Sequence, residues 1–413
     1  MVVKDVFARE ILDSRGNPTV EVDLITNNGL FRAAVPSGAS VGKYEAVELR
    51  DGGSRYLGKG VLRAIENINN IIKPAIVGKD IKSQEEIDSL MKKLDGTKNK
   101  KRLGANAILG VSMAFARAMA KEKNIFLFQY ISEIFRKKNK ERKIKLPKPS
   151  FNIINGGSHA GNELNYQEFM IIPQFVAFKE NLRAGVEIYH NLKTLLKEFG
   201  ENAINVGDEG GFVPPIKRPE EALDLIMSAI GLSNYDGKIK IALDVAASEF
   251  YDGKTGKYDG LNREEMIAHY AKLVKGYPIV SIEDPLNEDD FVGFSKMVKN
   301  FGKDILIIGD DILVTNKERI QKAIEIKACN GLLLKVNQIG TVTEALEAAS
   351  MAYDAGWKVM VSHRSGETID DFIADLAVGI GADYIKSGAT ARGERVAKYN
   401  QLLRIEELKN KGF

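Results

Sequence analysis

The chain has 413 residues, of which 44% are hydrophobic and 28% are charged, and its formal net charge is +3. This composition is that of a globular protein, and the length predicts either two domains or one large barrel. The basic residues are spread along the chain, so we expect no nucleic-acid partner. No apolar run approaches the roughly 20 residues that span a bilayer, so we expect no membrane insertion.

The first residues, MVVKDVFAREILD, alternate apolar and charged side chains and lack the basic and apolar blocks of an export signal. The single cysteine, Cys329, lies in the apolar context KACNGLLLK and cannot form an internal disulfide. A buried packing role is expected for it rather than a nucleophilic one. Both features predict a cytoplasmic location.

Residues 2–36 predict an antiparallel three-stranded meander, because alternation in TVEVDLIT places Val20, Val22 and Leu24 on one face. The sequence that follows is predominantly helical, and NAILGVSMAFARAMAKEK has the small residues of a closely packed helix. We expect these elements to form a smaller α+β domain over residues 1–135, which acts as a cap and lid.

The stretch 136–150, RKKNKERKIKLPKPS, is basic, poor in apolar residues and contains two prolines, which predicts a linker. Beyond it, short β-branched runs alternate with helical stretches. Residues 145–413 have about the length of a (β/α)8 barrel, so the predicted fold class is α/β, with a C-terminal (β/α)8-type barrel after the smaller α+β domain. Nine runs compete for eight places, and we expect one to be peripheral. They are FNIIN, EFMIIP, AINVG, IKIALDV, IVSIED, ILIIGD, LLLKV, KVMVS and DYIKSG.

Polar side chains accompany one run after another, and from Asp244 onward they are spaced by about one β/α unit. Such residues converge on one end of a barrel, where barrel enzymes have their active sites. The alternative is that they cap the following helices. The patterns Thr315–Glu318 and Thr341–Glu344 predict capping boxes that would do so instead, which favours a functional cluster. Its members are Glu168, Glu209, Asp244, Glu283, Asp310, Lys335, His363 and Lys386.

Asp244, Glu283 and Asp310 follow three neighbouring predicted strands. Three carboxylates in one confined site repel each other unless a cation neutralises them. Ligation by oxygen alone, without Cys or His, favours Mg²⁺ over Zn²⁺. Asp311 competes with Asp310 for this role, and because neighbours on a strand point to opposite faces we expect only one of them to enter the barrel.

Lys335 and Lys386 follow strands close to the predicted metal, so positive charge and partial burial should lower their pKa values. A neutral lysine can act as a base, and a lysine base beside a metal suits the removal of a proton next to a carboxylate. The alternative is that these lysines only balance the carboxylates.

The facing strands carry Glu168 and Glu209 beside glycine-rich loops, where a carboxyl group opposite the base can protonate a leaving hydroxyl. Arg364 and Ser365 in VSHRSGET combine a guanidinium with a hydroxyl, which suits a phosphate. Their neighbour His363 has either a role in this site or an ordinary structural one.

The motifs ILDSRGNPTVEVD, VPSGAS, NGGSHAGN, QEFMI, GDEGG, LDVAASEF, SIEDP, GDDILVTN, LLLKVNQIGT, SHRSGET and ARGER occur in this order. Together they resemble the enolase family (phosphopyruvate hydratase) over essentially the whole chain. The resemblance implies a carbon–oxygen lyase that reversibly dehydrates 2-phosphoglycerate to phosphoenolpyruvate in glycolysis and gluconeogenesis. It also implies two Mg²⁺ ions per active site, and a homodimer or a higher homo-oligomer such as an octamer, with Arg15 and Glu21 near Glu407 and Arg404 of another subunit.

Carried over residue by residue, the resemblance implies that Asp244, Glu283 and Asp310 bind the tighter Mg²⁺. Ser40, in the loop VPSGASVGKYEA, would bind the second ion, which arrives with substrate. Lys335 would remove the C2 proton, and Glu209 would expel the C3 hydroxyl with support from Glu168 and His159. Arg364 and Ser365 would hold the phosphate and Lys386 would contact the carboxylate region. The implied substrate contacts are His159, Gln167, Glu168, His363, Arg364, Ser365 and Lys386.

Two departures stand out: Val41 follows Ser40 where many relatives have Thr, which puts lid closure in doubt, and KSGATARGER replaces a segment that often contains Pro and Ser. Muconate-cycloisomerase-like and mandelate-racemase-like enzymes are alternatives that typically have a Lys-x-Lys strand, whereas the comparable strand here reads NYQEFMI. A catalytically silent barrel with a binding role is another alternative, which predicts losses among the charged residues. The sequence contains none of these losses.

Overall fold

The computed structural model describes residues 1–38, 42–157 and 160–412, so the expectations for Ser40, Val41 and His159 lie outside the described residues. The chain begins with an antiparallel sheet of the order β1-β2-β3, as the alternation predicted. Val20, Val22 and Leu24 are all buried on one face of it. The three strands are Val3–Leu12, Pro18–Thr26 and Gly29–Ala34.

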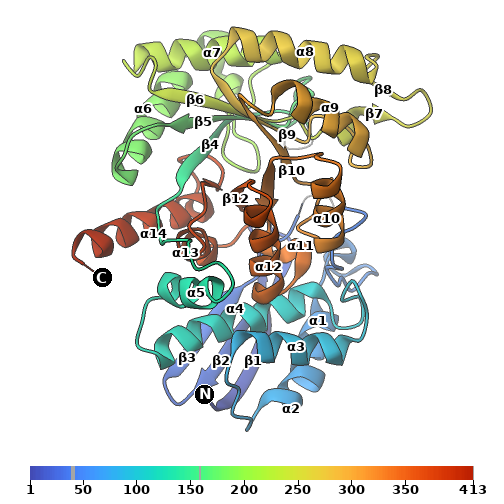
Figure 1. The fold of residues 1–413 in the computed structure, drawn as a ribbon, viewed down its shortest axis with the longest axis vertical. Helices are drawn as coiled ribbons and strands as arrows, with labels where there is room; N and C mark the ends of the chain where they lie inside the picture. The colour runs from blue at the N-terminus through green and yellow to red at the C-terminus, as the bar shows by residue number, and fades with distance from the viewer. Residues whose placement is uncertain (39–41, 158–159, 413) are drawn as a thin grey trace.

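Helices follow this sheet, and the long helix α4 packs against β2 and β3 (Figure 1). The small residues of α4 permit a close approach, since a Cβ at Gly110 would lie 2.6 Å from Cγ2 of Val22. Helix α3 is capped by Ser83, which accepts a hydrogen bond from the backbone N–H of Glu86. The elements are η1 (Arg55–Gly58), α1 (Leu62–Asn67), η2 (Ile68–Ile72), α2 (Lys73–Ile76), α3 (Gln84–Asp95), α4 (Ala105–Glu122) and α5 (Leu127–Arg136).

The later part of the chain forms a closed eight-stranded barrel of the order β10-β11-β12-β13-β4-β5-β6-β9, which confirms the predicted barrel. Its strands are β4 (Lys148–Asn155), β5 (Glu168–Pro173), β6 (Ile239–Asp244), β9 (Ile279–Glu283), β10 (Leu306–Gly309), β11 (Gly331–Leu334), β12 (Lys358–Ser362) and β13 (Tyr384–Lys386). A small hairpin, β7 (Tyr251–Asp252) and β8 (Lys257–Tyr258), lies outside it. The α-helices are α6 (Phe178–Leu196), α7 (Pro219–Leu232), α8 (Arg263–Gly276), α9 (Phe291–Phe301), α10 (Lys317–Glu325), α11 (Val336–Ile339), α12 (Val342–Asp354), α13 (Phe372–Gly379) and α14 (Gly393–Asn410). Short helical turns are η4 (Lys197–Phe199), η5 (Glu201–Ile204) and η6 (Ala247–Phe250).

One strand departs from the expected repetition of strand and helix. β5 is antiparallel to both β4 and β6, whereas the other neighbouring pairs in the barrel are parallel. No described helix lies between β4 and β5, so the chain turns back directly, and direct return gives an antiparallel pair. As a result Glu168, the first residue of β5, lies at the barrel end where the parallel strands finish.

The peripheral run among the nine is AINVG. Its first two residues end η5, and Val206 forms an antiparallel bridge to Phe212, which in turn bridges Ile154 of β4. Glu209 lies in the loop between Val206 and Phe212. The prediction that it follows a barrel strand is therefore wrong. The loop still docks on β4, which holds Glu209 at the barrel.

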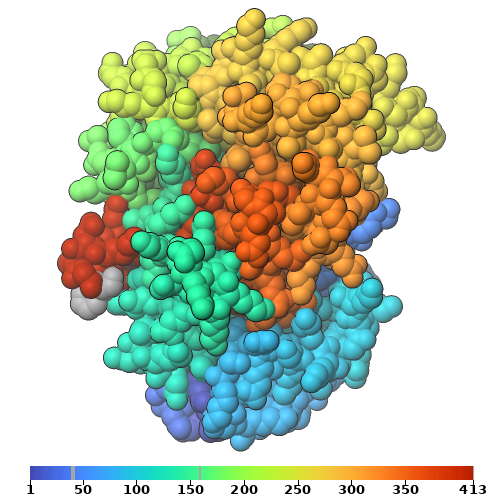
Figure 2. All heavy atoms as spheres, viewed as in Figure 1, coloured from blue at the N-terminus to red at the C-terminus, as the bar shows by residue number. Residues whose placement is uncertain are grey.

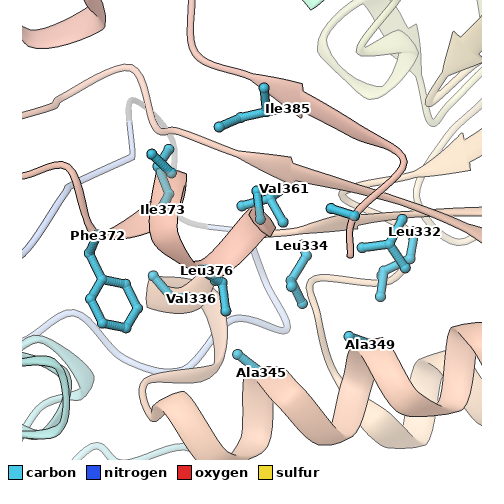
Figure 3. Close-up of a cluster of buried hydrophobic side chains, with 14 of the residues drawn as sticks. Leu332, Leu334, Val336, Ala345, Ala349, Val361, Phe372, Ile373, Leu376 and Ile385 are labelled. Atoms are coloured by element: carbon cyan, nitrogen blue, oxygen red, sulfur yellow. The ribbon is translucent and has the colours of Figure 1, made fainter. Parts of the chain in front are cut away.

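The barrel core is built where the strands meet the outer helices. Leu332 and Leu334 of β11 and Val361 of β12 lie beside Ala345 and Ala349 of α12 (Figure 3), and all five are buried. Small side chains on α12 let this helix pack close to the strands. Among the described residues, no helix is long and apolar enough to cross a membrane.

The N-terminal part of the chain forms one end of the molecule and lies directly against the barrel (Figure 2). Ion pairs cross the contact: the guanidinium of Arg117 lies 2.8 Å from Asp370, and the buried Lys100 ammonium lies 2.9 Å from Glu344. These ion pairs hold the small domain against the barrel, so a loop of the small domain can contribute to a site at the barrel end.

Candidate active site

The strand ends of the barrel surround a cavity of about 250 Å³. Glu45 of the small domain joins its wall, and the other described lining residues come from the barrel part of the chain. Glu283 is buried close by and contacts Lys386. The structure therefore brings nearly all the predicted site residues together. Those that line the cavity are Gln167, Glu168, Glu209, Asp244, Asp310, Lys335, His363, Arg364, Ser365 and Lys386.

Three acidic residues form a row across neighbouring strands. Glu168 at the start of β5 is in register with Asp244 at the end of β6, and Asp244 is in register with Glu283 at the end of β9. The row exists because β5 runs antiparallel. All three side chains are buried, so carboxylates placed this close require positive charge beside them.

Lys386 supplies part of that charge. Its Nζ lies 2.9 Å from Oδ2 of Asp244, 2.9 Å from Oε1 of Glu283 and 3.1 Å from Oε1 of Glu168. Burial lowers the pKa of Lys386, but Asp244 and the other carboxylates raise it more, so the pKa stands well above its ordinary value. The acidic row by itself outweighs desolvation, so the expected lowering of this pKa depends on the charge of a neighbouring metal.

Lys335 follows β11 and forms an ion pair with Oδ2 of Asp310, whose Oδ1 accepts a hydrogen bond of 2.9 Å from Nε2 of Gln338. Burial lowers the pKa of Lys335, but the charges of Asp310 and Glu283 act in the opposite direction, and the pKa stands above its ordinary value. The expected lowering again depends on the charge of a neighbouring metal. The backbone N–H of Lys335 donates to Oγ1 of Thr315 at 3.0 Å. Thr315 therefore supports the site, and Asn316, not Thr315, caps α10.

Asp310 and Asp311 both line the cavity, so the expectation that only one would enter is wrong. Strand β10 ends at Gly309, and the alternation of faces ends with it. Asp284 accepts backbone N–H bonds from Asp310 at 3.0 Å and Asp311 at 2.6 Å, and its own backbone is left-handed, with φ 41°. Burial and the charge of Asp310 raise the pKa of Asp311 to about 8.

The carboxylates present fit a divalent cation. Burial and repulsion from Asp244, with a further contribution from Asp310, raise the pKa of Glu283 well above its ordinary value. This is the effect expected of carboxylates that are held together and that a cation would relieve. Oxygens of Asp284, Asp310 and Asp311 also lie within 4.8 Å of one another, but both Asp284 oxygens already bind backbone N–H groups. The oxygens of Glu283 and Asp310 are likewise bonded, to Lys386, Lys335 and Gln338. Asp244, Glu283 and Asp310, the donors expected from the sequence, present hard oxygens of the kind that suits Mg²⁺.

Glu209 is buried against residues of two other segments. Its Oε2 accepts a hydrogen bond of 3.1 Å from Nδ2 of Asn152 on β4 and lies 3.3 Å from Nε2 of His363, which follows β12. Burial raises the pKa of nearby Glu168 well above its ordinary value, and the charge of Glu209 adds to this effect. Glu168 and Glu209 thus form a pair in which one carboxyl group favours the protonated form of the other.

Arg364 lines the cavity and is almost fully buried. Its guanidinium donates to both carboxylate oxygens of Glu45, at 3.0 and 3.2 Å, and to Oδ1 of Asn337 at 3.0 Å. Ser365 lines the cavity beside it. The paired Arg364 and Glu45 give the small domain a direct ionic contact with the barrel site.

Several residues that shape the site were missed from the sequence. Glu45 and Arg395 lie inside the motifs VPSGASVGKYEA and ARGER, but a charged residue within a loop motif gives no local sign of its partner. Asn152 and Gln338 are uncharged and occupy a strand and a short helix. Only their hydrogen bonds to Glu209 and Asp310 reveal their roles.

Comparison with known proteins adds to this geometry. Residues 3–131 match the family model described as "Enolase, N-terminal domain", and residues 143–412 match "Enolase, C-terminal TIM barrel domain". A protein named "Enolase" from Mastigamoeba balamuthi is 55% identical over 422 residues, which covers 98% of this chain and 95% of that protein. The fold, the site and these matches agree along the chain, which therefore belongs to the enolase family of carbon–oxygen lyases.

Proposed function

We propose that the enzyme interconverts 2-phosphoglycerate and phosphoenolpyruvate in a Mg²⁺-dependent reaction of glycolysis and gluconeogenesis, in the cytoplasm, at the cavity of the barrel. The observation that carries this proposal is the placement of a lysine and a carboxyl group on different parts of the cavity. Lys335, after β11, is paired with a carboxylate of the predicted metal site. Glu209 lies in a loop that docks on β4, three strands around the barrel from β11. A base and an acid on different parts of one cavity suit a dehydration that removes a proton and a hydroxyl from neighbouring carbons.

In this proposal the neutral Lys335 takes the C2 proton, and the electron pair left at C2 forms the C2–C3 double bond. The C3–O bond then breaks, and the oxygen leaves as water with the proton of Glu209, supported by Glu168 and by His159. The pKa of Lys335 must fall for this role. The positive charge of a bound Mg²⁺ opposes the effect of Asp310 and favours the neutral amine.

Mg²⁺ held by Asp244, Glu283 and Asp310 would stabilise negative charge that develops on the substrate carboxylate. Ser40 is proposed to bind a second Mg²⁺ that arrives with substrate. Among the described residues, the all-oxygen donor set of the first site supports the choice of metal. We propose no nucleic-acid partner.

The remaining site residues are proposed to hold the substrate. Arg364 and Ser365 suit the phosphate, since a guanidinium binds phosphate oxygens in a bidentate manner. Lys386 suits the carboxylate region, because its ammonium is a cationic donor at the wall of the cavity. Gln167, whose Nε2 donates to Asp244 at 3.2 Å, and His363 line the cavity. The family resemblance adds His159 to the proposed substrate contacts.

The test is to add 2-phosphoglycerate to the purified full chain and follow the ultraviolet absorbance of the enol product, with Mg²⁺ and with a chelator. We expect product only when Mg²⁺ is present. No product with Mg²⁺ at any concentration would contradict the proposal, and the same would be true of full activity after complete removal of the metal.

A further inference from the structure

Arg395 is a fully buried arginine in the first turn of α14, and it touches the wall of the active site from behind. Its Nη1 lies 2.6 Å from Nδ1 of His363 and donates to the carbonyl of Arg364 at 2.7 Å. Its Nη2 donates to the carbonyls of Ser365 at 2.6 Å and Asp208 at 3.0 Å. The guanidinium thus joins the loop that carries His363 to the loop that carries Glu209.

The contact with the imidazole determines where the ring proton lies. A guanidinium has N–H donors and no acceptor, so Nδ1 of His363 must accept with its lone pair. Burial lowers the pKa of His363 to about 3, and the charges of Arg395 and Lys386 contribute to this lowering against the opposing effect of Glu209. A neutral imidazole carries one proton, and with Nδ1 used as an acceptor that proton is on Nε2.

The Nε2–H group then faces Glu209, whose Oε2 lies 3.3 Å away, without the geometry of a hydrogen bond. Nδ2 of Asn152 donates to the same oxygen at 3.1 Å. A proton on Oε2 would point at these two N–H groups, whereas an unprotonated Oε2 presents lone pairs to them. The acidic proton of Glu209 therefore belongs on Oε1.

We propose that Arg395 is a positioning residue for the dehydration step: it fixes His363 as the Nε2–H tautomer, which with Asn152 directs the acidic proton of Glu209 to Oε1. The inference rests on the proposed role of Glu209 as the acid. In the step itself the O–H bond of Glu209 breaks as the leaving C3 oxygen takes the proton, so Glu209 becomes a carboxylate and the oxygen leaves as water.

The same tautomer makes one set of potential metal ligands unsuited to a metal. Glu168, Glu209 and His363 offer ligand atoms within 4.8 Å of one another. An imidazole binds a metal through a nitrogen lone pair, and in this tautomer the nitrogen that faces Glu209 is protonated. Arg395 thereby keeps this part of the site for proton transfer.

The first test is the ring nitrogen NMR spectrum of the full chain labelled with ¹⁵N-histidine, recorded near neutral pH without substrate. The chain has 4 histidines, and the His363 signals are those lost in a His363→Gln variant. We expect a protonated Nε2 and an unprotonated Nδ1. A protonated Nδ1 in the wild-type protein would overturn the proposal, and this result does not depend on whether the protein turns over 2-phosphoglycerate.

The second test compares Arg395→Lys with the matched control Arg392→Lys. Arg392 donates to the carbonyls of Gly207 at 3.1 Å and Ser14 at 3.2 Å, so it also holds the Glu209 loop, but no hydrogen bond of the described residues joins it to His363. Arg395→Lys should mix the two tautomers and lower kcat by at least about tenfold with a smaller change in KM. Arg392→Lys should keep the single tautomer. Equal tautomer mixing in both variants, or none in either, would contradict the proposal.

If Arg395→Lys does not fold, two variants of His363 test which ring nitrogen is the hydrogen-bond donor. The side-chain amide introduced by His363→Gln reaches the place of Nε2–H, whereas the shorter amide introduced by His363→Asn reaches only the place of Nδ1. We expect kcat to be at least about tenfold higher for His363→Gln than for His363→Asn. Equal values, or a higher value for His363→Asn, would overturn the assigned tautomer.

Discussion

The carboxylate of Glu45 and the guanidinium of Arg364 form a two-point ion pair at the active-site wall, with N–O distances of 3.0 and 3.2 Å. Both side chains are almost fully shielded from solvent. The proposed phosphate group of the substrate uses the same guanidinium. Substrate must therefore share Arg364 with Glu45 or displace it.

Glu45→Gln should lower the KM for 2-phosphoglycerate, because the neutral amide competes less well for Arg364. The same change should lower the free energy of unfolding of the free enzyme by about 1.5 to 3 kcal/mol, the usual value of a hydrogen bond to a charged group. Steady-state kinetics and chemical denaturation measure the two effects. A raised KM together with unchanged stability would contradict this competition.

Asp310→Asn should weaken Mg²⁺ binding by at least about tenfold and cripple turnover, because it removes a charged oxygen ligand. Calorimetric titration of the protein with Mg²⁺ measures the first effect independently of activity. Asp311→Asn is the matched control, since Asp311 also lines the cavity beside Asp310. Normal turnover of Asp310→Asn at limiting Mg²⁺, with a dead Asp311→Asn variant, would mean that the ligand was chosen wrongly.

Asp375 of α13 provides a test of pH dependence away from the site. Burial raises its pKa to about 7, from an ordinary value of 3.8, with a contribution from Asp371. Because the folded state holds this proton more tightly than the unfolded state, stability should fall as the pH rises from about 4 to 7. Asp375→Asn removes this titration, so its stability relative to the wild type should increase over that range. A difference that is constant with pH would contradict the assignment.

The homodimer that the family resemblance implies predicts the sedimentation coefficient of a dimer at micromolar concentration. Arg15 donates to the carbonyl of Gly38 at 2.8 Å within its own chain, whereas Arg9 forms an ion pair with Glu21. Arg404 and Glu407 are exposed, and the contact of Arg15 and Glu21 with Glu407 and Arg404 of another subunit stays a prediction. Only monomer at that concentration would rule the dimer out, and an octamer would retain the dimer contact.

The barrel and most of its site could be predicted because the charged residues of the site directly follow apolar runs in the sequence. Asp244, Glu283 and Lys386 each end a short apolar strand, so their convergence followed from the fold class. The direction of β5 could not be predicted, because EFMIIP has no feature that sets the direction of the strand. The division into residues 1–135 and 145–413 stays a prediction.

The partners of buried polar groups could not be predicted from the sequence. Arg395 reaches His363 only because the start of α14 packs behind the β12 loop, a contact between segments 32 residues apart. The expectation that only one of Asp310 and Asp311 enters the barrel rested on an alternation that ends with the strand at Gly309. In each case the deciding fact is a contact or a backbone change that no local pattern encodes.

The most direct test of the proposed mechanism is deuterium incorporation at C2 of 2-phosphoglycerate, followed by NMR beside product formation in the same buffer. Lys335→Ala removes the base, so both exchange and dehydration should be lost. Glu209→Gln keeps the base and the metal ligands, so exchange should outlast dehydration. If Lys335→Ala exchanges the C2 proton at the wild-type rate, the base is another group, with Lys386 the first candidate, and the division of roles between Lys335 and Glu209 is wrong.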